Sequence, residues 1–95
     1  MARIIWTPQA LADLENIAEY ISKDSRKFAS IFVENILEIV ANLELFPESG
    51  RIVPELQNSK IREILSGNYR IIYSYKSDLV EILTVFHSAR LWNNQ

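Results

Sequence analysis

The sequence predicts an α+β fold in one domain spanning residues 1–95, ordered β-α-α-β-β-β, with an N-terminal helical hairpin packed on one face of an antiparallel sheet. Ninety-five residues suffice for one domain and no more. Apolar residues recur at helical spacing in the first half, whereas the second half holds short β-branched and aromatic runs separated by turn residues. Because 48% of the residues are apolar and 23% charged, the chain can bury one core without disulfides or metals.

The chain opens with a predicted strand followed by an amphipathic helix. Arg3–Trp6 is short, β-branched and aromatic, which is typical of a strand. Thr7 suits the N-cap of the helix, and Pro8 suits its first position, where a missing N–H group costs nothing. The predicted helix ends near Lys23 and Asp24, and its apolar stripe consists of Ala10, Leu11, Leu14, Ile17, Ala18 and Ile21.

A second amphipathic helix is predicted directly after the first. Ser25 suits its N-cap, and Pro47 ends it, since the residue before a proline is pushed out of the α region. Its broader apolar arc consists of Phe28, Ala29, Phe32, Val33, Ile36, Ile39, Val40 and Leu43. Because the link between the two helices is so short, we expect them to form an antiparallel hairpin.

The second half is predicted to begin with a loop over residues 47–59, which is rich in Pro, Gly, Asn and Ser. Gly67 and Asn68 suit a two-residue hairpin turn of type I′ or II′, and a second turn follows at 76–78. No helix or strand is predicted for the tail, residues 88–95. Three strands are predicted, in this order: Lys60–Ser66, Tyr69–Lys76 and Leu79–His87.

A two-residue turn fixes which side chains share a face of the first hairpin. It pairs Arg62 with Tyr73 and places Arg70 on the same face as Glu63, opposite to the face of Arg62. Both faces are partly apolar, so both need cover. The helices cover one face, and a partner protein is a candidate for the other. The register of the last hairpin stays open by one residue, and a slip would invert its faces.

The charge distribution argues against a protein built to wrap nucleic acid, because the net charge is −2 and the pI about 5.3. The two halves differ: residues 1–48 sum to −4 (4 positive, 8 negative) and residues 49–95 to +2 (6 positive, 4 negative). Two interpretations remain open. An acidic helical surface simply precedes a mixed sheet, or arginines of the second half line a site for an acidic partner.

Several chemistries are excluded by composition. The absence of cysteine excludes disulfides, thiolate zinc sites, iron–sulfur clusters and cysteine nucleophiles, and a single histidine, His87, excludes a His-rich metal site. Two glycines in different contexts cannot build a phosphate-binding loop. We therefore expect no metal or cofactor. No apolar run approaches the roughly 20 residues of a membrane span, and the N-terminus does not resemble a signal peptide, so we expect a soluble cytoplasmic protein.

Three residues of the second half are candidates for a functional site. Arg70, in mid-strand, either forms a salt bridge to Glu63 or aims its guanidinium at a phosphate or carboxylate. His87 is either a structural hydrogen-bonding group or a residue that titrates near neutrality. Arg90 is either a solvated charge near the end of the chain or an anion ligand.

Taken together, these segments resemble the RelE/ParE toxin superfamily. The resemblance rests on "TPQALADLENIAEYI", a Pro–Gly loop ending in "PEL", an "IRE" strand, "GNYRIIY" and a closing "VFHSAR", and it spans essentially the whole chain. It implies a toxin of a type II toxin–antitoxin pair. Such a toxin is neutralised in a hetero-oligomer by a cognate antitoxin, whose flexible segment wraps it.

The resemblance implies one of two activities. Some members are ribosome-dependent, metal-independent endoribonucleases that cut mRNA through attack of the 2′-OH, leaving a 2′,3′-cyclic phosphate. In such members Glu55 and His87 would be the acid–base pair, Arg70 would offset charge on the phosphate and Arg90 would bind it. Others inhibit DNA gyrase by protein contact, for which Arg62, Arg70, Arg90 and Trp92 are the candidate contact residues.

Two departures from the nuclease pattern favour the gyrase-inhibiting, ParE-like branch. The chain ends in "LWNNQ" and lacks the tyrosine that the nucleases carry near their C-terminus. It also lacks the Lys and Arg enrichment that lets a protein sit against ribosomal RNA. A third interpretation is an inactive member that only binds its antitoxin.

Overall fold

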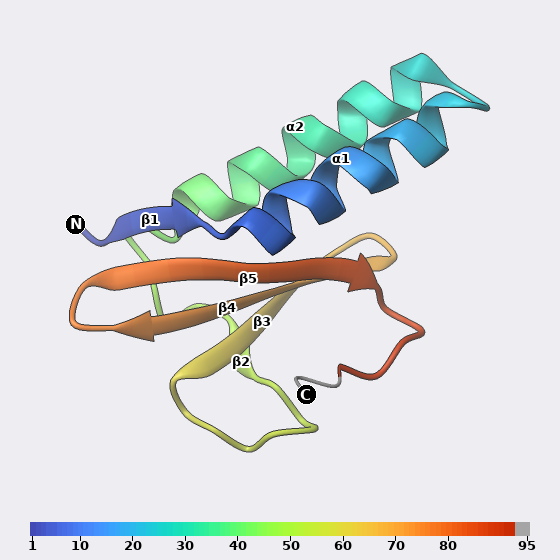
Figure 1. Ribbon diagram of the computed structural model, residues 1–95. Coiled ribbons are helices and arrows are strands. Elements are labelled where there is room, and N and C mark those ends of the chain that lie inside the picture. Colours follow the sequence, from blue (N-terminus) through green and yellow to red (C-terminus); the bar gives the residue numbers. More distant parts are fainter. Residues whose placement is uncertain (93–95) are drawn as a thin grey trace.

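A computed structural model describes residues 1–92, which form two helices and a five-stranded sheet (Figure 1). The elements are β1 (Arg3–Trp6), α1 (Pro8–Ser22), α2 (Arg26–Asn42), β2 (Arg51–Ile52), β3 (Ile61–Ser66), β4 (Tyr69–Lys76) and β5 (Leu79–His87). Both helices lie on one side of the sheet, hereafter the helix-side face, and the opposite side is the second face (Figure 1). The predicted α+β fold with its helical hairpin is thus confirmed. Within residues 1–92, neither helix is long and apolar enough to cross a membrane.

The sheet is mixed, with the strand order β1-β5-β4-β3-β2. Strands β2 to β5 are antiparallel as predicted, but β1 runs parallel to β5, with Arg3 opposite Leu79. The wholly antiparallel sheet of the prediction is therefore corrected at this edge, because local patterns do not encode the direction of a partner so distant in sequence. The predicted loop also holds a two-residue strand, β2, where Arg51 pairs with Glu63. Two residues are too few for periodicity to show.

Both helices begin at the predicted caps. The Thr7 Oγ1 atom accepts the Ala10 N–H at 3.2 Å and donates to the Ile82 carbonyl at 2.7 Å, so the cap also joins α1 to β5. The Ser25 hydroxyl accepts the Phe28 N–H at 3.1 Å. Helix α2 ends at Asn42, earlier than Pro47 alone requires, because the following residues turn toward the N-terminus. There the Glu44 carbonyl accepts the Ala2 N–H at 2.9 Å.

The two hairpins have different registers. β3 and β4 pair as predicted, with Arg62 opposite Tyr73, and Gly67 takes a φ of +54° in the turn. In the second hairpin the turn residues Ser77 and Asp78 both have positive φ, as a type I′ turn requires. A bulge then shifts the register, since Tyr73 pairs with Ile82 but Ile72 pairs with Thr84. The bulge inverts the faces of the last residues of β5.

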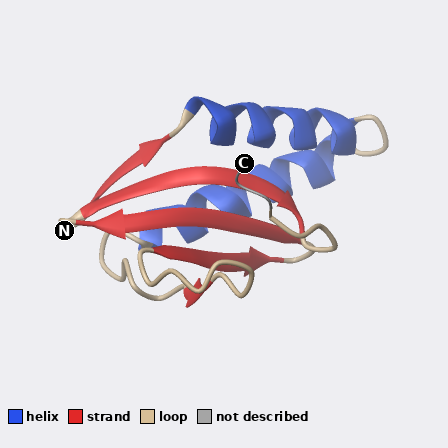
Figure 2. Ribbon diagram, turned by 60° about the horizontal axis from the view of Figure 1, so that its bottom comes forward, coloured by secondary structure: helices blue, strands red, loops and turns tan. Residues whose placement is uncertain are grey.

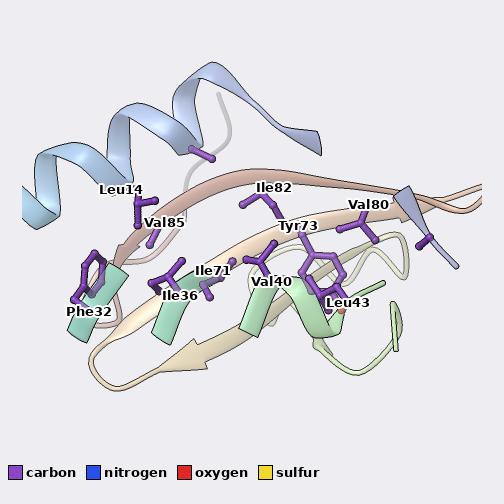
Figure 3. Packing of buried hydrophobic residues seen from close by; sticks show 12 residues of the cluster. Leu14, Phe32, Ile36, Val40, Leu43, Ile71, Tyr73, Val80, Ile82 and Val85 are labelled. Atoms are coloured by element: carbon purple, nitrogen blue, oxygen red, sulfur yellow. The ribbon is translucent and has the colours of Figure 1, made fainter. Parts of the chain in front are cut away.

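The main core lies between the helices and the sheet (Figure 3). The Tyr73 side chain is fully buried there, and its hydroxyl donates to the Pro47 carbonyl at 2.8 Å and accepts the Gly50 N–H at 2.9 Å. A Cβ at position 50 would lie 2.6 Å from that hydroxyl, so only glycine fits. The labelled core side chains are Leu14, Phe32, Ile36, Val40, Leu43, Ile71, Tyr73, Val80, Ile82 and Val85.

The second face carries a smaller apolar cluster that the chain covers itself. Val53 and Leu56 of the loop and Trp92 of the tail pack with Ile72 and Phe86 of the sheet. In Figure 2, turned so that this side comes forward, loop segments lie over the strands while the helices lie behind and above. The expectation that this face depends on a partner for its cover is therefore corrected, since the loop and tail supply much of that cover.

Candidate functional site

Arg70 is the second residue of β4 and has its side chain on the second face, and only 5% of the residue is exposed. Its guanidinium carbon lies 5.2 Å from the centre of the Phe86 ring. A guanidinium stays charged even when buried, so its position requires anionic partners.

Carboxylates and a carbonyl engage all three nitrogen atoms of the Arg70 guanidinium through four hydrogen bonds. The Nε donates to the Glu63 Oε1 at 2.7 Å. The Nη1 donates to the Glu55 Oε2 at 2.7 Å and to the Arg90 carbonyl at 3.0 Å. The Nη2 contacts the Glu55 Oε1 at 2.8 Å and the Glu63 Oε1 at 2.6 Å. The hydrogen bonds to Glu55 are the main reason why the pKa of Arg70 is raised.

Glu55 binds Arg70 with both carboxylate oxygens, the bidentate geometry in which arginine pairs most strongly. Its Oε2 also accepts the Trp92 N–H at 2.8 Å, so one carboxylate fastens both the loop and the tail to the sheet. These contacts, chiefly the hydrogen bonds from Arg70, lower the pKa of Glu55 from 4.5 to about 2. Glu55 is therefore ionised throughout the physiological range.

Glu63, on β3, has a fully buried side chain that lies between two arginines. Its Oε1 binds Arg70, and its Oε2 accepts a hydrogen bond from the Nε of Arg51, whose side chain is 63% exposed. We call Arg51, Glu55, Glu63 and Arg70 the ionic cluster. Its two positive and two negative charges balance, which allows Glu63 and Arg70 to remain buried while Arg51 reaches the solvent at the edge of the cluster.

A shallow cavity of about 520 Å³ opens beside the ionic cluster. Two leucines on its wall are exposed to solvent, Leu65 by 51% and Leu91 by 80%. Within residues 1–92 no group of three or more His, Cys, Asp or Glu side chains is placed to hold a metal. The cavity is lined by Arg51, Pro54, Glu55, Leu65, Arg70, Ser88 and Leu91.

His87 does not join this site, because the bulge places it on the helix-side face. It pairs with Tyr69, and the centres of the two rings lie 5.7 Å apart. Tyr69 in turn packs against Phe32 of α2 at 4.9 Å. The His87 Nδ1 accepts the Ala89 N–H at 3.0 Å. Without the bulge, strict alternation along β5 would have placed His87 on the face of Arg70.

The remaining predicted residues fall in separate places. Arg62 projects from the helix-side face, where it donates to the Gly50 carbonyl at 2.9 Å and pairs with Glu48 at 3.6 Å, and so holds the loop. The Arg90 guanidinium carbon lies 5.3 Å from the centre of the Phe86 ring, on the second face. Trp92 is half-buried in the second-face cluster. The structure thus brings Glu55, Arg70, Arg90 and Trp92 together.

Sequence reasoning missed Arg51 as a member of the site. Its pairing with Glu63 depends on β2, a strand too short to leave a pattern. Leu65 carried a signal, since it alternates onto the face of Arg70. Leu91 follows the last strand and carries no periodic signal.

Comparisons with known proteins agree on one family. A model described as the ParE toxin of the type II toxin–antitoxin system parDE matches residues 4–92. The chain is 35% identical over 92 residues to Toxin RelE2 of Caulobacter vibrioides, covering 96% of this chain and 100% of that protein. It is 40% identical over 91 residues to the putative toxin Y4kP of Sinorhizobium fredii, covering 95% and 92% of the two chains.

Solved structures share the fold. A chain from a chromosomal ParDE system of P. aeruginosa superposes with a TM-score of 0.74 at 23% identity, covering 92% of this chain and 96% of that one. A chain from the heterotetrameric YoeB–YefM toxin–antitoxin complex of Staphylococcus aureus gives a TM-score of 0.53 at 17% identity, covering 88% and 93%.

Proposed function

Since this chain belongs to the ParE/RelE family of toxins from type II toxin–antitoxin systems, we propose that it inhibits DNA gyrase by protein contact, without chemistry of its own. The observation that carries the proposal is that Glu55, Glu63 and the Arg90 carbonyl bind all three nitrogen atoms of the Arg70 guanidinium, whose residue is only 5% exposed. A nuclease needs free donors aimed at the charge that develops on the phosphate. In this chain the Arg70 guanidinium is instead bound by the protein's own carboxylates and carbonyl.

The acid–base chemistry of a nuclease also lacks support from the geometry. A general base works best with a pKa near the working pH, whereas the pKa of Glu55 is about 2. His87, the partner that the resemblance implies for it, lies on the other face of the sheet. The two groups therefore do not converge on one position where a substrate could react.

Charge supports the same conclusion. Binding along ribosomal RNA is driven by lysines and arginines that neutralise phosphates. This chain has a net charge of −2 and an acidic first half. A modest positive excess in residues 49–95 suits contact with a protein surface rather than with a polyanion.

The proposal is tested with the purified full chain in two parallel assays, gyrase supercoiling and cleavage of ribosome-bound mRNA. We expect inhibition of supercoiling, intact mRNA, and unchanged inhibition by the His87→Ala variant. Cleavage of mRNA that His87→Ala abolishes would overturn the proposal in favour of the endoribonuclease. Activity in neither assay, together with tight binding of the cognate antitoxin, would also contradict it and identify a member that only binds its antitoxin.

A further inference from the structure

We infer that the cavity beside the ionic cluster is the surface that binds the target protein, DNA gyrase. Its ligand is an extended segment of the target that presents a carboxylate to Arg51 and an apolar side chain to Leu65 and Leu91. This inference rests on the proposed function and names the part of the surface that performs it.

The first argument is the placement of exposed apolar side chains. On the second face the chain buries Val53, Ile72 and Phe86 under its own loop and tail. Leu65 and Leu91 escape this cover and stand 51% and 80% exposed on the wall of one cavity. Apolar side chains that line a concave surface beside fixed polar groups are typical of recognition sites.

The second argument is the set of free hydrogen-bond donors. Arg51 uses its Nε toward Glu63, and its two terminal NH₂ groups donate to no acceptor within residues 1–92. Glu55, the one carboxylate that lines the cavity, is bound by Arg70, and the buried Glu63 is shared between Arg70 and the Nε of Arg51, so neither carboxylate occupies the outer fork of Arg51. The group that the cavity lacks is therefore an anion placed to meet the outer fork of Arg51. A carboxylate fits that fork with two parallel hydrogen bonds.

The third argument is the edge of the sheet at this point. β2 pairs only with Arg62 and Glu63, so within residues 1–92 the outer edge of β3 at 64–66 has no neighbouring strand. Leu65 belongs to both this edge and the cavity. An extended segment can add to such an edge through its backbone while its side chains enter the cavity. The ionic cluster holds the floor in place, so little order must be created on binding.

The test compares variants in the supercoiling assay and in direct binding to gyrase. Leu65→Thr and Leu91→Ser should each raise the half-inhibitory concentration about tenfold, as loss of an interface anchor does. Arg51→Gln should raise it about threefold and weaken the salt dependence of binding. Leu45→Ser is the matched control, because Leu45 is 63% exposed and lies in the turn after α2, outside the cavity. It should stay within about twofold of the parent.

Thermal unfolding and antitoxin binding show that each variant is folded. If both leucine variants inhibit gyrase with the same half-inhibitory concentration as the parent, this inference is overturned and the proposed function stays intact. Loss of antitoxin binding with unchanged gyrase inhibition would assign the cavity to the antitoxin and overturn it as well. A parent protein that does not inhibit gyrase would refute the proposed function, and this inference with it.

Discussion

The two faces of the sheet are held by different forces. On the helix-side face, side chains such as Ile36 and Ile82 are fully buried among other apolar groups. On the second face, the equally buried Glu63 and the nearly buried Arg70 are held by opposite charges. Loss of apolar packing costs free energy roughly in proportion to the atoms removed, whereas loss of a buried member of an ion cluster also leaves the charge of its buried partners uncompensated. Substitutions on the helix-side face should therefore cost stability in graded steps, whereas substitutions of the buried charges on the second face should each cost much of it.

The largest effect is expected from a substitution at the centre of the ionic cluster. Arg70→Met leaves the fully buried Glu63 with only one cationic partner, and we expect a loss of about 4 kcal/mol in the free energy of unfolding. Urea denaturation followed by circular dichroism measures it. The double variant Arg70→Met/Glu63→Leu should recover more than half of that loss, because it removes the buried carboxylate that Arg70 no longer balances. A double variant no more stable than the single one would contradict this account.

A smaller and pH-independent effect is expected on the helix-side face. Ile36→Ala opens a cavity in the apolar core, which should cost about 3 kcal/mol. The same loss is expected at pH 6 and pH 3, because no charge is involved. Ile36→Val, which removes a single methylene, should cost only about 1 kcal/mol. A loss that changed with pH would show that the two faces are not independent.

Acid should destabilise the contacts of the second face, which depend on ionised carboxylates, but not the apolar packing of the helix-side face. The pKa of Glu55 is about 2 in the folded protein and 4.5 when unperturbed, so its contribution to stability is complete above pH 4.5 and is lost as the pH falls toward 2. The urea midpoint of the parent should therefore fall more between pH 6 and pH 3 than that of Glu55→Gln. At pH 6 that variant should be about 1–2 kcal/mol less stable. Equal acid sensitivity in the two proteins would contradict the role given to Glu55.

The smallest effect concerns the link between the helices, remote from both the core centre and the ionic cluster. Ser25→Ala removes the hydroxyl that caps α2 and should cost about 1 kcal/mol. Ser25→Gly is the control, since glycine is tolerated at an N-cap and should cost only a few tenths of that. Thermal denaturation of the parent and both variants measures these losses. A melting temperature of Ser25→Ala equal to that of the parent would show that the cap contributes nothing.

What the sequence predicted follows the same division. The helix caps at Thr7 and Ser25 and the turn at Gly67 were predictable because each depends on a few adjacent residues. The partnership of Arg70 with Glu63 followed from alternation across one hairpin, whereas Glu55 reaches the cluster from a loop without periodicity.

The position of His87 shows why the rest was not predictable. One extra residue in β5 changes its face, and nothing in the composition of that strand marks the bulge. The candidate site could thus be predicted in its residue types, but the group of residues that meet there depends on tertiary pairing.

The parallel pairing of β1 with β5 sets the timing of the protein's own maturation. Arg3 emerges from the ribosome first, yet its neighbour Leu79 follows about 75 residues later, which at about 5–20 residues per second is a delay of roughly 4–15 s. During that interval the nascent chain carries an unseated N-terminal segment and an unfinished sheet edge. The sheet is therefore complete only after β5 has been translated.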